Sequence, residues 1–285
     1  MREYRQVSRE LHREDTTFRV GPIEVGGERI VMMVGPCAVE GRAQLLETAE
    51  AVAAAGFPIL RGGAFKPRTS PYAFRGLLEE GLELLAEARE LTGLPVITEV
   101  MSEADVDLVA RYADVLQIGA RSMHSFRLLE VVADAGRPIM LKRGFHATIK
   151  EWLLAAEYIV RRGNEQVILC ERGIRSFDDE YTRNVLDLTA VPVAKRETHL
   201  PVFVDPSHGT GRADLIIPMA KAAIAAGADG LMIETHPNPA AAMCDGDQSL
   251  ATEDLPRLAR EVERMARAMD RTTRTPEGER ELVLA

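Results

Sequence analysis

The sequence is poor in cysteine and has no long apolar run. Cys37, Cys170 and Cys244 are the only cysteines among 285 residues, and none belongs to a C-x-x-C motif. Three thiols cannot all pair with one another, so the count argues against a disulfide scaffold and indicates a reduced, cytoplasmic chain. No apolar stretch approaches the roughly 20 residues of a membrane span, which argues against an integral membrane protein.

A positive charge excess and a signal peptide are missing as well. Lys and Arg number 35 while Asp and Glu number 44, which gives a net charge of −9. Nucleic acids and anionic membranes favour basic surfaces, so neither is expected as the main partner. The chain starts with MREYRQVSRELHRED, which is charged and has no apolar core, unlike a signal peptide.

Eight short apolar runs alternate along the chain with eight longer segments rich in alanine and leucine. The apolar runs cover residues 30–34, 58–60, 95–98, 115–118, 138–141, 166–170, 201–204 and 230–233. The longer segments have the apolar spacing of helices and cover residues 44–55, 77–92, 104–112, 126–135, 149–162, 186–196, 215–226 and 255–269. Nearly continuous Val, Ile, Leu and Met is typical of parallel strands that are buried on both faces.

This alternation predicts an α/β fold, a (β/α)8 TIM barrel in a single domain. The runner-up is a doubly wound open sheet, which no glycine-rich dinucleotide motif supports. A barrel of roughly 250 residues uses nearly all of the 285. We expect an N-terminal extension over residues 1–29 with a small hairpin around Gly26-Gly27, the catalytic barrel over residues 30–270, and a polar C-terminal tail over residues 271–285.

Polar and reactive side chains follow every predicted strand, whereas the strand starts are mostly proline and small or apolar residues. In barrels of this type the chemistry takes place at the carboxyl ends of the strands, so the asymmetry predicts an enzyme. One subset of these side chains is cationic and consists of Arg61, Lys66, Arg68, Arg121, Lys142, Arg143 and Arg172. Guanidinium and ammonium groups hold phosphates and carboxylates, so this rim is expected to bind two or more anionic groups.

A second subset has the donors of a metal site. It consists of Cys37, His208, Glu234 and Asp245, which offer one thiolate, one imidazole and two carboxylates. Such donors can bind a divalent transition metal that acts as a Lewis acid on a carbonyl oxygen. Two other roles stay open from residue type alone: Cys37 as a small buried apolar residue, and Asp245 as a helix cap near Ser249.

Seven motifs together resemble one enzyme family. They are GPCAVE (35–40), GGAFKPRTSPYAFRG (62–76), QIGAR (117–121), LKRG (141–144), ERGIR (171–175), DPSHGTGR (205–212) and DGDQSL (245–250). In this order they resemble 3-deoxy-D-arabino-heptulosonate 7-phosphate (DAHP) synthase of the type I-beta branch. The resemblance implies a TIM-barrel transferase of the EC 2.5.1 class that joins phosphoenolpyruvate to D-erythrose 4-phosphate and releases phosphate, the first step of the shikimate pathway of aromatic amino acid biosynthesis.

The resemblance also implies roles for individual residues. The metal ligands would be Cys37, His208, Glu234 and Asp245, with Mn²⁺ as the ion and Co²⁺, Fe²⁺ or Zn²⁺ as alternatives. The phosphate of phosphoenolpyruvate would be held by Arg121, Lys142, Arg172 and the backbone amide of Ala120. Its carboxylate end would meet Arg61 and Lys66.

The remaining implied roles concern the aldose and the chemical steps. The phosphate of erythrose 4-phosphate would be held by Arg68 and Thr69. The expected catalytic residues are Lys66, Glu99 and His208, with Lys66 handling protons and Glu99 lying near the carbon that water attacks.

Two alternatives stand beside this activity. The related 3-deoxy-manno-octulosonate 8-phosphate synthases perform the same chemistry on arabinose 5-phosphate, but they typically have Ala-Asn after the lysine where this chain has Pro67-Arg68-Thr69-Ser70. Cys37 favours metal dependence, because metal-independent relatives of that kind have Asn there. The second alternative is a specialised or inactive paralogue that acts as a binding partner, for which the departures from the family pattern are Ser122, His124, Ser125, Phe145, His146, Thr235 and Cys244.

The resemblance carries two further expectations. The family commonly forms tetramers, so a homo-oligomer is expected. Type I-beta enzymes often carry a regulatory or chorismate mutase domain at the N-terminus, and residues 1–29 are too few for either. We therefore expect no built-in regulatory domain.

Overall fold

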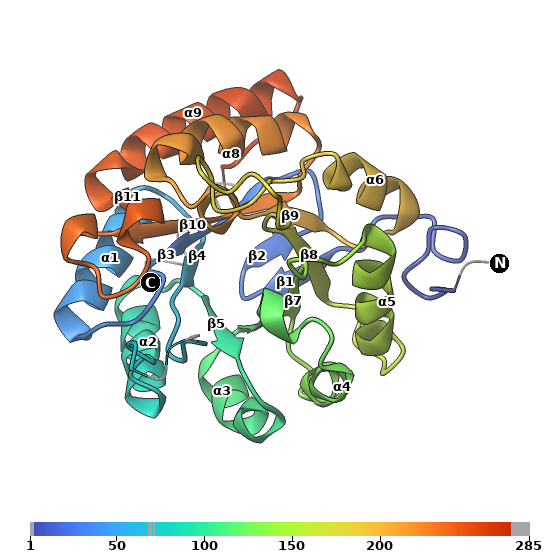
Figure 1. Ribbon diagram of the computed structural model, residues 1–285, viewed down its shortest axis with the longest axis horizontal. Coiled ribbons are helices and arrows are strands. Elements are labelled where there is room, and N and C mark those ends of the chain that lie inside the picture. Colours follow the sequence, from blue (N-terminus) through green and yellow to red (C-terminus); the bar gives the residue numbers. More distant parts are fainter. Residues whose placement is uncertain (1–2, 68–69, 71, 275–285) are drawn as a thin grey trace.

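Residues 3–67, 70 and 72–274 are described by the structure, a computed structural model. Eight parallel strands form a closed barrel (Figure 1). They are β3 (Val31–Gly35), β4 (Ile59–Arg61), β5 (Val96–Val100), β6 (Val115–Ile118), β7 (Ile139–Lys142), β8 (Val167–Glu171), β9 (Val202–Val204) and β10 (Gly230–His236). Strand β10 pairs with β9 on one side and with β3 on the other, which closes the sheet and confirms the predicted (β/α)8 fold.

Helices alternate with the strands and surround the barrel (Figure 1). They are α1 (Arg42–Ala54), α2 (Glu79–Thr92), α3 (Val106–Tyr112), α4 (Phe126–Asp134), α5 (Ile149–Val160), α6 (Ala190–Glu197), α8 (Ile216–Ala225) and α9 (Leu255–Ala268). Within the described part of the chain, no helix combines the length and the hydropathy that a membrane crossing requires.

The apolar core has two layers, which explains why the strands are apolar throughout. Successive residues of a strand point to opposite sides of the sheet. In β3, Met32 and Val34 belong to the outer layer between sheet and helices, while Val31 and Met33 belong to the cluster that fills the barrel interior. Both faces of each strand are therefore buried, as the sequence pattern predicts.

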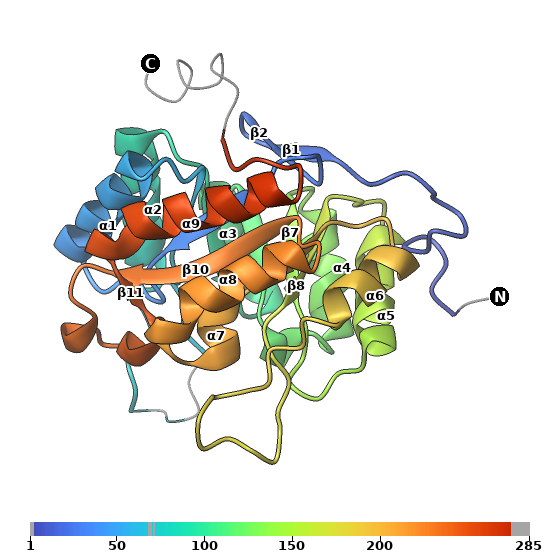
Figure 2. The same ribbon diagram turned by 90° about the horizontal axis from the view of Figure 1, so that it is seen from above.

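A small hairpin closes the amino-terminal end of the barrel. Strands β1 (Phe18–Val20) and β2 (Ile23–Val25) are antiparallel, and their turn is Gly21-Pro22 rather than the expected Gly26-Gly27. Gly21 has a φ of 55°, which a two-residue hairpin turn requires and glycine adopts without strain. Val20, Ile23 and Val25 join the interior cluster, so the hairpin acts as a floor, while α7 (Pro206–Thr210) lies at the opposite end (Figure 2).

Three details differ from the elements expected from the sequence. Helix α6 begins at Ala190 and not at residue 186. The short helix α7 directly after β9 was not anticipated, nor was β11 (Leu250–Ala251), which pairs in parallel with β10. The division into extension, barrel and tail stays a prediction, and residues 275–285 of the predicted tail lie outside the described residues.

Gly230 at the start of β10 gives a test of the packing. A Cβ atom there would lie 2.3 Å from the Phe203 ring and 2.4 Å from the carbonyl oxygen of Val31. We expect G230A to lower the free energy of unfolding by about 3 kcal/mol, because backbone and ring both have to move. Urea denaturation measures the change. The control is G41A, since no atom lies within 4 Å of a Cβ built on Gly41; equal stability of the two variants would contradict the packing argument.

Candidate active site

A cavity of about 820 Å³ opens at the carboxyl ends of the barrel strands. Most of the predicted site residues line it, namely Arg61, Lys66, Glu99, Ala120, Arg121, Lys142, Arg172, His208 and Asp245. Arg68 and Thr69 lie outside the described residues. Cations and potential metal donors thus share one cavity, as the polar residues after the predicted strands indicate.

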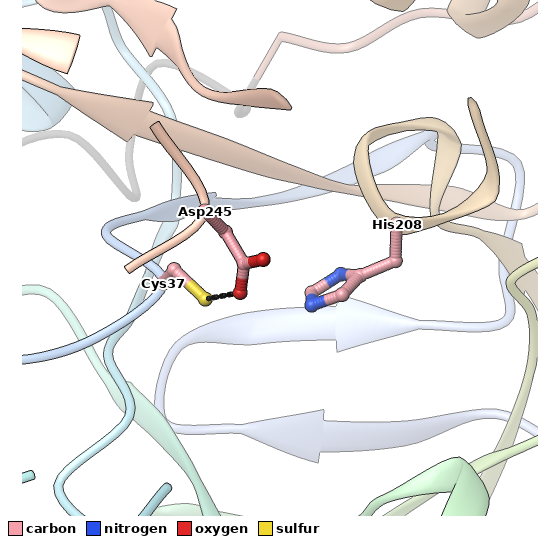
Figure 3. Close-up of side chains that lie close together, drawn as sticks. All are labelled: Cys37, His208 and Asp245. Carbon is pink, nitrogen blue, oxygen red and sulfur yellow. Dashed lines mark hydrogen bonds between the residues drawn. The ribbon is translucent and has the colours of Figure 1, made fainter. Parts of the chain in front are cut away.

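Three of the four predicted metal ligands come together (Figure 3). The Cys37 sulfur, a His208 ring nitrogen and an Asp245 carboxylate oxygen all lie within 4.8 Å of one another, although they come from segments that follow β3, β9 and β10. Cys37 Sγ lies 3.1 Å from Asp245 Oδ2. Asp245 has a left-handed backbone, with φ 53°, a conformation uncommon outside glycine and often found at functional sites.

The DPSH segment fixes the orientation of His208. Asp205 caps α7, accepting a hydrogen bond from the backbone nitrogen of His208 at 2.9 Å, and its Oδ2 lies 2.7 Å from His208 Nδ1. Burial lowers the pKa of His208 to about 4, against the raising effect of the Asp205 and Glu234 carboxylates. The ring is therefore neutral at pH 7. Its hydrogen bonding assigns the proton to Nδ1 and leaves the Nε2 lone pair open for a metal.

Glu234, the fourth predicted ligand, takes a different position. Its Oε1 lies 2.5 Å from Arg61 Nη1 and 3.2 Å from His208 Nε2, and its other oxygen accepts a hydrogen bond from Gln248. It is not part of the three-residue group. With a neutral His208, two acceptors face each other at 3.2 Å, an arrangement that a cation stabilises.

Neighbouring groups shift the pKa values of the Cys37 thiol and the Asp245 carboxylate. A hydrogen bond to Cys244, burial and the charge of Glu234 raise the pKa of Cys37 well above its usual range, so binding of a metal has to displace a proton from the thiol. Burial opposes the ionisation of Asp245, but hydrogen bonds from Cys244 and Cys37 bring its pKa below the usual range. The donor set of sulfur, nitrogen and oxygen therefore fits a divalent transition metal.

The cations of the cavity differ in how they are paired. Lys66 Nζ lies 2.9 Å from Cys37 Sγ, Lys142 Nζ lies 2.6 Å from Asp205, and Arg61 contacts Glu234. Arg172 is 4% exposed, and its Nη1 has no hydrogen-bond partner in the part of the chain that the structure describes. A buried guanidinium nitrogen without a partner is costly, so this position favours an anionic ligand.

Comparison with known proteins decides the family. The profile of the DAHP synthetase I family matches residues 13–271. The chain belongs to the DAHP synthetase I family. This confirms the family that the motifs predict and, with it, an enzyme that condenses phosphoenolpyruvate with erythrose 4-phosphate in aromatic biosynthesis. Metal dependence is a property of this family, and the group Cys37, His208 and Asp245 is a candidate metal site.

Relatives with curated names agree. The chain is 51% identical to a phospho-2-dehydro-3-deoxyheptonate aldolase of Thermotoga maritima, over 94% of this chain and 79% of the relative. Its identity to a 2-dehydro-3-deoxyphosphooctonate aldolase of Acidithiobacillus ferrooxidans is 35%, over 86% of this chain and 94% of the relative. The crystal structure of the Thermotoga DAHP synthase superimposes with a TM-score of 0.93 at 50% identity, covering 95% of this chain and 79% of that one.

The prediction that Arg143 belongs to the cationic rim is wrong. Arg143 does not line the cavity, and its guanidinium pairs with Glu171 at 2.8 Å and Asp187 at 2.9 Å. Lys142 and Arg143 are neighbours at the end of β7, so they point to opposite sides, and only Lys142 faces the cavity. The histidines His124 and His146 are exposed and do not line the cavity either.

Several lining residues were not predicted. Arg175, Asp179, Arg183 and Asn184 come from the long segment between β8 and α6. Arg183 Nη2 lies 3.0 Å from the Asp245 carboxylate, so this segment reaches the metal group. The ERGIR motif contains Arg175 and could have pointed to it. No motif contains the other three residues, which reach the cavity because of the path that the chain takes after β8. The site assignments themselves stay predictions.

The Arg143 pair gives the second test. Glu171 is fully buried, and burial raises its pKa even beside Arg143, so loss of the arginine leaves an uncompensated acid. We expect R143M to lower the free energy of unfolding by about 3–5 kcal/mol in urea denaturation. The control is R162M, which breaks an exposed pair with Asp134 and should cost less than about 1 kcal/mol. Equal losses for the two variants would show that the buried pair is not stabilising.

Proposed function

We propose that this cavity performs the condensation of phosphoenolpyruvate with D-erythrose 4-phosphate, with one divalent ion, Mn²⁺, at Cys37, His208 and Asp245. Glu234 is proposed as the fourth ligand. One observation carries the proposal: Arg172, whose buried Nη1 has no hydrogen-bond partner among the described residues, lines the same cavity as His208 and Asp245 of the metal donor group. A homotetramer in the cytoplasm is proposed with it.

The cations of the cavity would hold phosphoenolpyruvate. Its phosphate meets Arg121, Arg172, Lys142 and the backbone amide of Ala120, and its carboxylate meets Arg61 and Lys66. The metal, when bound, supplies Lewis-acid polarisation of the aldehyde oxygen. Holding both substrates in reacting geometry supplies much of the rate enhancement.

Two residues then handle protons. The methylene carbon of phosphoenolpyruvate forms a bond to the aldehyde carbon, and Lys66 donates a proton to the aldehyde oxygen. Burial lowers the pKa of Lys66, but Cys37, Cys244 and Glu234 raise it above its usual range, so the ammonium form is present. Glu99 takes a proton from the water that adds to the adjacent carbon of phosphoenolpyruvate, and the resulting hemiketal phosphate releases inorganic phosphate.

The octulosonate reaction is the second candidate, because the chain is 35% identical to enzymes with that name over most of its length. The identity of 51% to a heptulosonate enzyme favours erythrose 4-phosphate as the aldose. The Pro67-Arg68-Thr69-Ser70 sequence after Lys66 favours the same aldose.

Phosphate release tests the proposal. Purified protein with phosphoenolpyruvate and erythrose 4-phosphate is expected to release phosphate, to stop when a chelator removes the metal, and to resume with excess Mn²⁺. A parallel reaction contains arabinose 5-phosphate. Release only with the five-carbon sugar would establish the second candidate, and release that survives complete chelation would contradict the metal assignment.

Gly119 tests the role of Glu99. Gln117 Nε2 donates a hydrogen bond to Glu99 Oε2 at 2.9 Å, and a Cβ on Gly119 would lie 2.1 Å from Glu99 Oε1. We expect G119A to displace the carboxylate and lower kcat by about 10- to 100-fold, because general-base catalysis depends on position. The contact is with a flexible side-chain end, so thermal stability should change little. An unchanged kcat would remove Glu99 from the mechanism.

A further inference from the structure

Phe145 lies at the centre of three arginines. The guanidinium carbons of Arg172, Arg121 and Arg175 lie 4.7, 5.2 and 5.7 Å from the centre of its ring. Arg121 follows β6, Phe145 follows β7, and the other two arginines follow β8. All four side chains line the active-site cavity, so the cluster is part of its wall.

The three guanidinium groups carry like charges and repel one another. Burial lowers the pKa of Arg172, and the charges of Arg183 and Arg121 lower it further, against the raising effect of Asp205. The face of a phenyl ring is negative and attracts cations within about 6 Å of its centre. The ring of Phe145 therefore offsets part of the repulsion and holds the arginines close together before any anion binds.

Backbone contacts hold the segment that carries Phe145 in place. Arg175 donates its backbone N–H to the carbonyl oxygen of Phe145 at 2.9 Å, which ties the segments after β7 and β8 together. On the other side, the backbone nitrogen of Gly144 lies 3.1 Å from the sulfur of Met123, which follows Arg121 by two residues. These contacts hold the backbone of Phe145 next to the segments that carry all three arginines.

We propose that Phe145 is a positioning residue for phosphoenolpyruvate: its ring holds Arg121 and Arg172 as a pair around the phosphate and brings Arg175 to the same anion site. This inference rests on the proposed function, which assigns Arg121 and Arg172 to that phosphate. Phe145 acts through the arginines, so it affects the binding of phosphoenolpyruvate and not that of the aldose.

The variant F145L tests this role, because leucine keeps an apolar side chain and removes the aromatic face. Kinetics give KM for each substrate and kcat, and calorimetry with Mn²⁺-loaded protein gives Kd for phosphoenolpyruvate alone and for inorganic phosphate. We expect F145L to raise KM and Kd for phosphoenolpyruvate, and Kd for phosphate, by about tenfold. KM for erythrose 4-phosphate and kcat should stay within about twofold of the unchanged protein.

Two further variants separate an electrostatic role from a packing role. F145Y keeps the aromatic face and should restore KM and Kd for phosphoenolpyruvate and Kd for phosphate. R175M should raise Kd for phosphate, as F145L does. The matched control is F177L, since Phe177 is fully exposed and does not line the cavity. If F145L lowers thermal stability and kcat but leaves KM and Kd for phosphoenolpyruvate unchanged, Phe145 is a packing residue and the proposal is overturned.

R172M distinguishes a failure of this inference from a failure of the proposed function. Phosphate binding weakened by R172M but not by F145L would overturn the role of Phe145 alone. Phosphate binding unaffected by R172M would overturn the assignment of the phosphate site itself, and with it the basis of the inference.

Discussion

A line of buried cations and carboxylates, joined through the neutral imidazole of His208, crosses the carboxyl end of the barrel, and the rest of the site depends on it. Lys142 lies 2.6 Å from Asp205, Asp205 lies 2.7 Å from His208, His208 lies 3.2 Å from Glu234, and Glu234 lies 2.5 Å from Arg61. Removing Arg61 or Lys142 leaves Glu234 or Asp205 buried without its cationic partner, which is far more costly than loss of a surface pair. The line therefore fixes the directions of β4, β7, β9 and β10 side chains before substrate binds.

Phe145 and the buried line position cations in different ways. Arg61 and Lys142 are held by carboxylates, whereas Arg121 and Arg172 lie against an aromatic face. A carboxylate neutralises a cation and competes with substrate, but a phenyl ring orients it and leaves its charge available. An anionic substrate is therefore expected to meet its strongest attraction at the arginines around Phe145.

The sequence predicted the barrel well because each strand is apolar on both faces and is followed by polar residues. It could not predict which partner each side chain would reach. Alternation states that Lys142 and Arg143 face opposite sides, but only the closed sheet shows that Arg143 reaches Glu171 and Asp187. The hairpin shows the same limit, since Gly21-Pro22 and Gly26-Gly27 both suit a turn, and the apolar Val20 and Ile23 that fill the barrel floor decide between them.

The apolar filling of the barrel determines at which level its buried charges lie. The interior cluster is apolar up to Cys170, Phe203 and Met232, so charged side chains in the barrel find partners only above this level. Arg61 and Lys142 are the last residues of their strands. Arg61 pairs with Glu234 of β10, and Lys142 pairs with Asp205, which directly follows β9. Arg121 and Arg172 follow β6 and β8 and lie against the ring of Phe145 instead. Because an aromatic face leaves their charges available, an anionic ligand is expected at these two arginines, in the cavity that His208 and Asp245 also line.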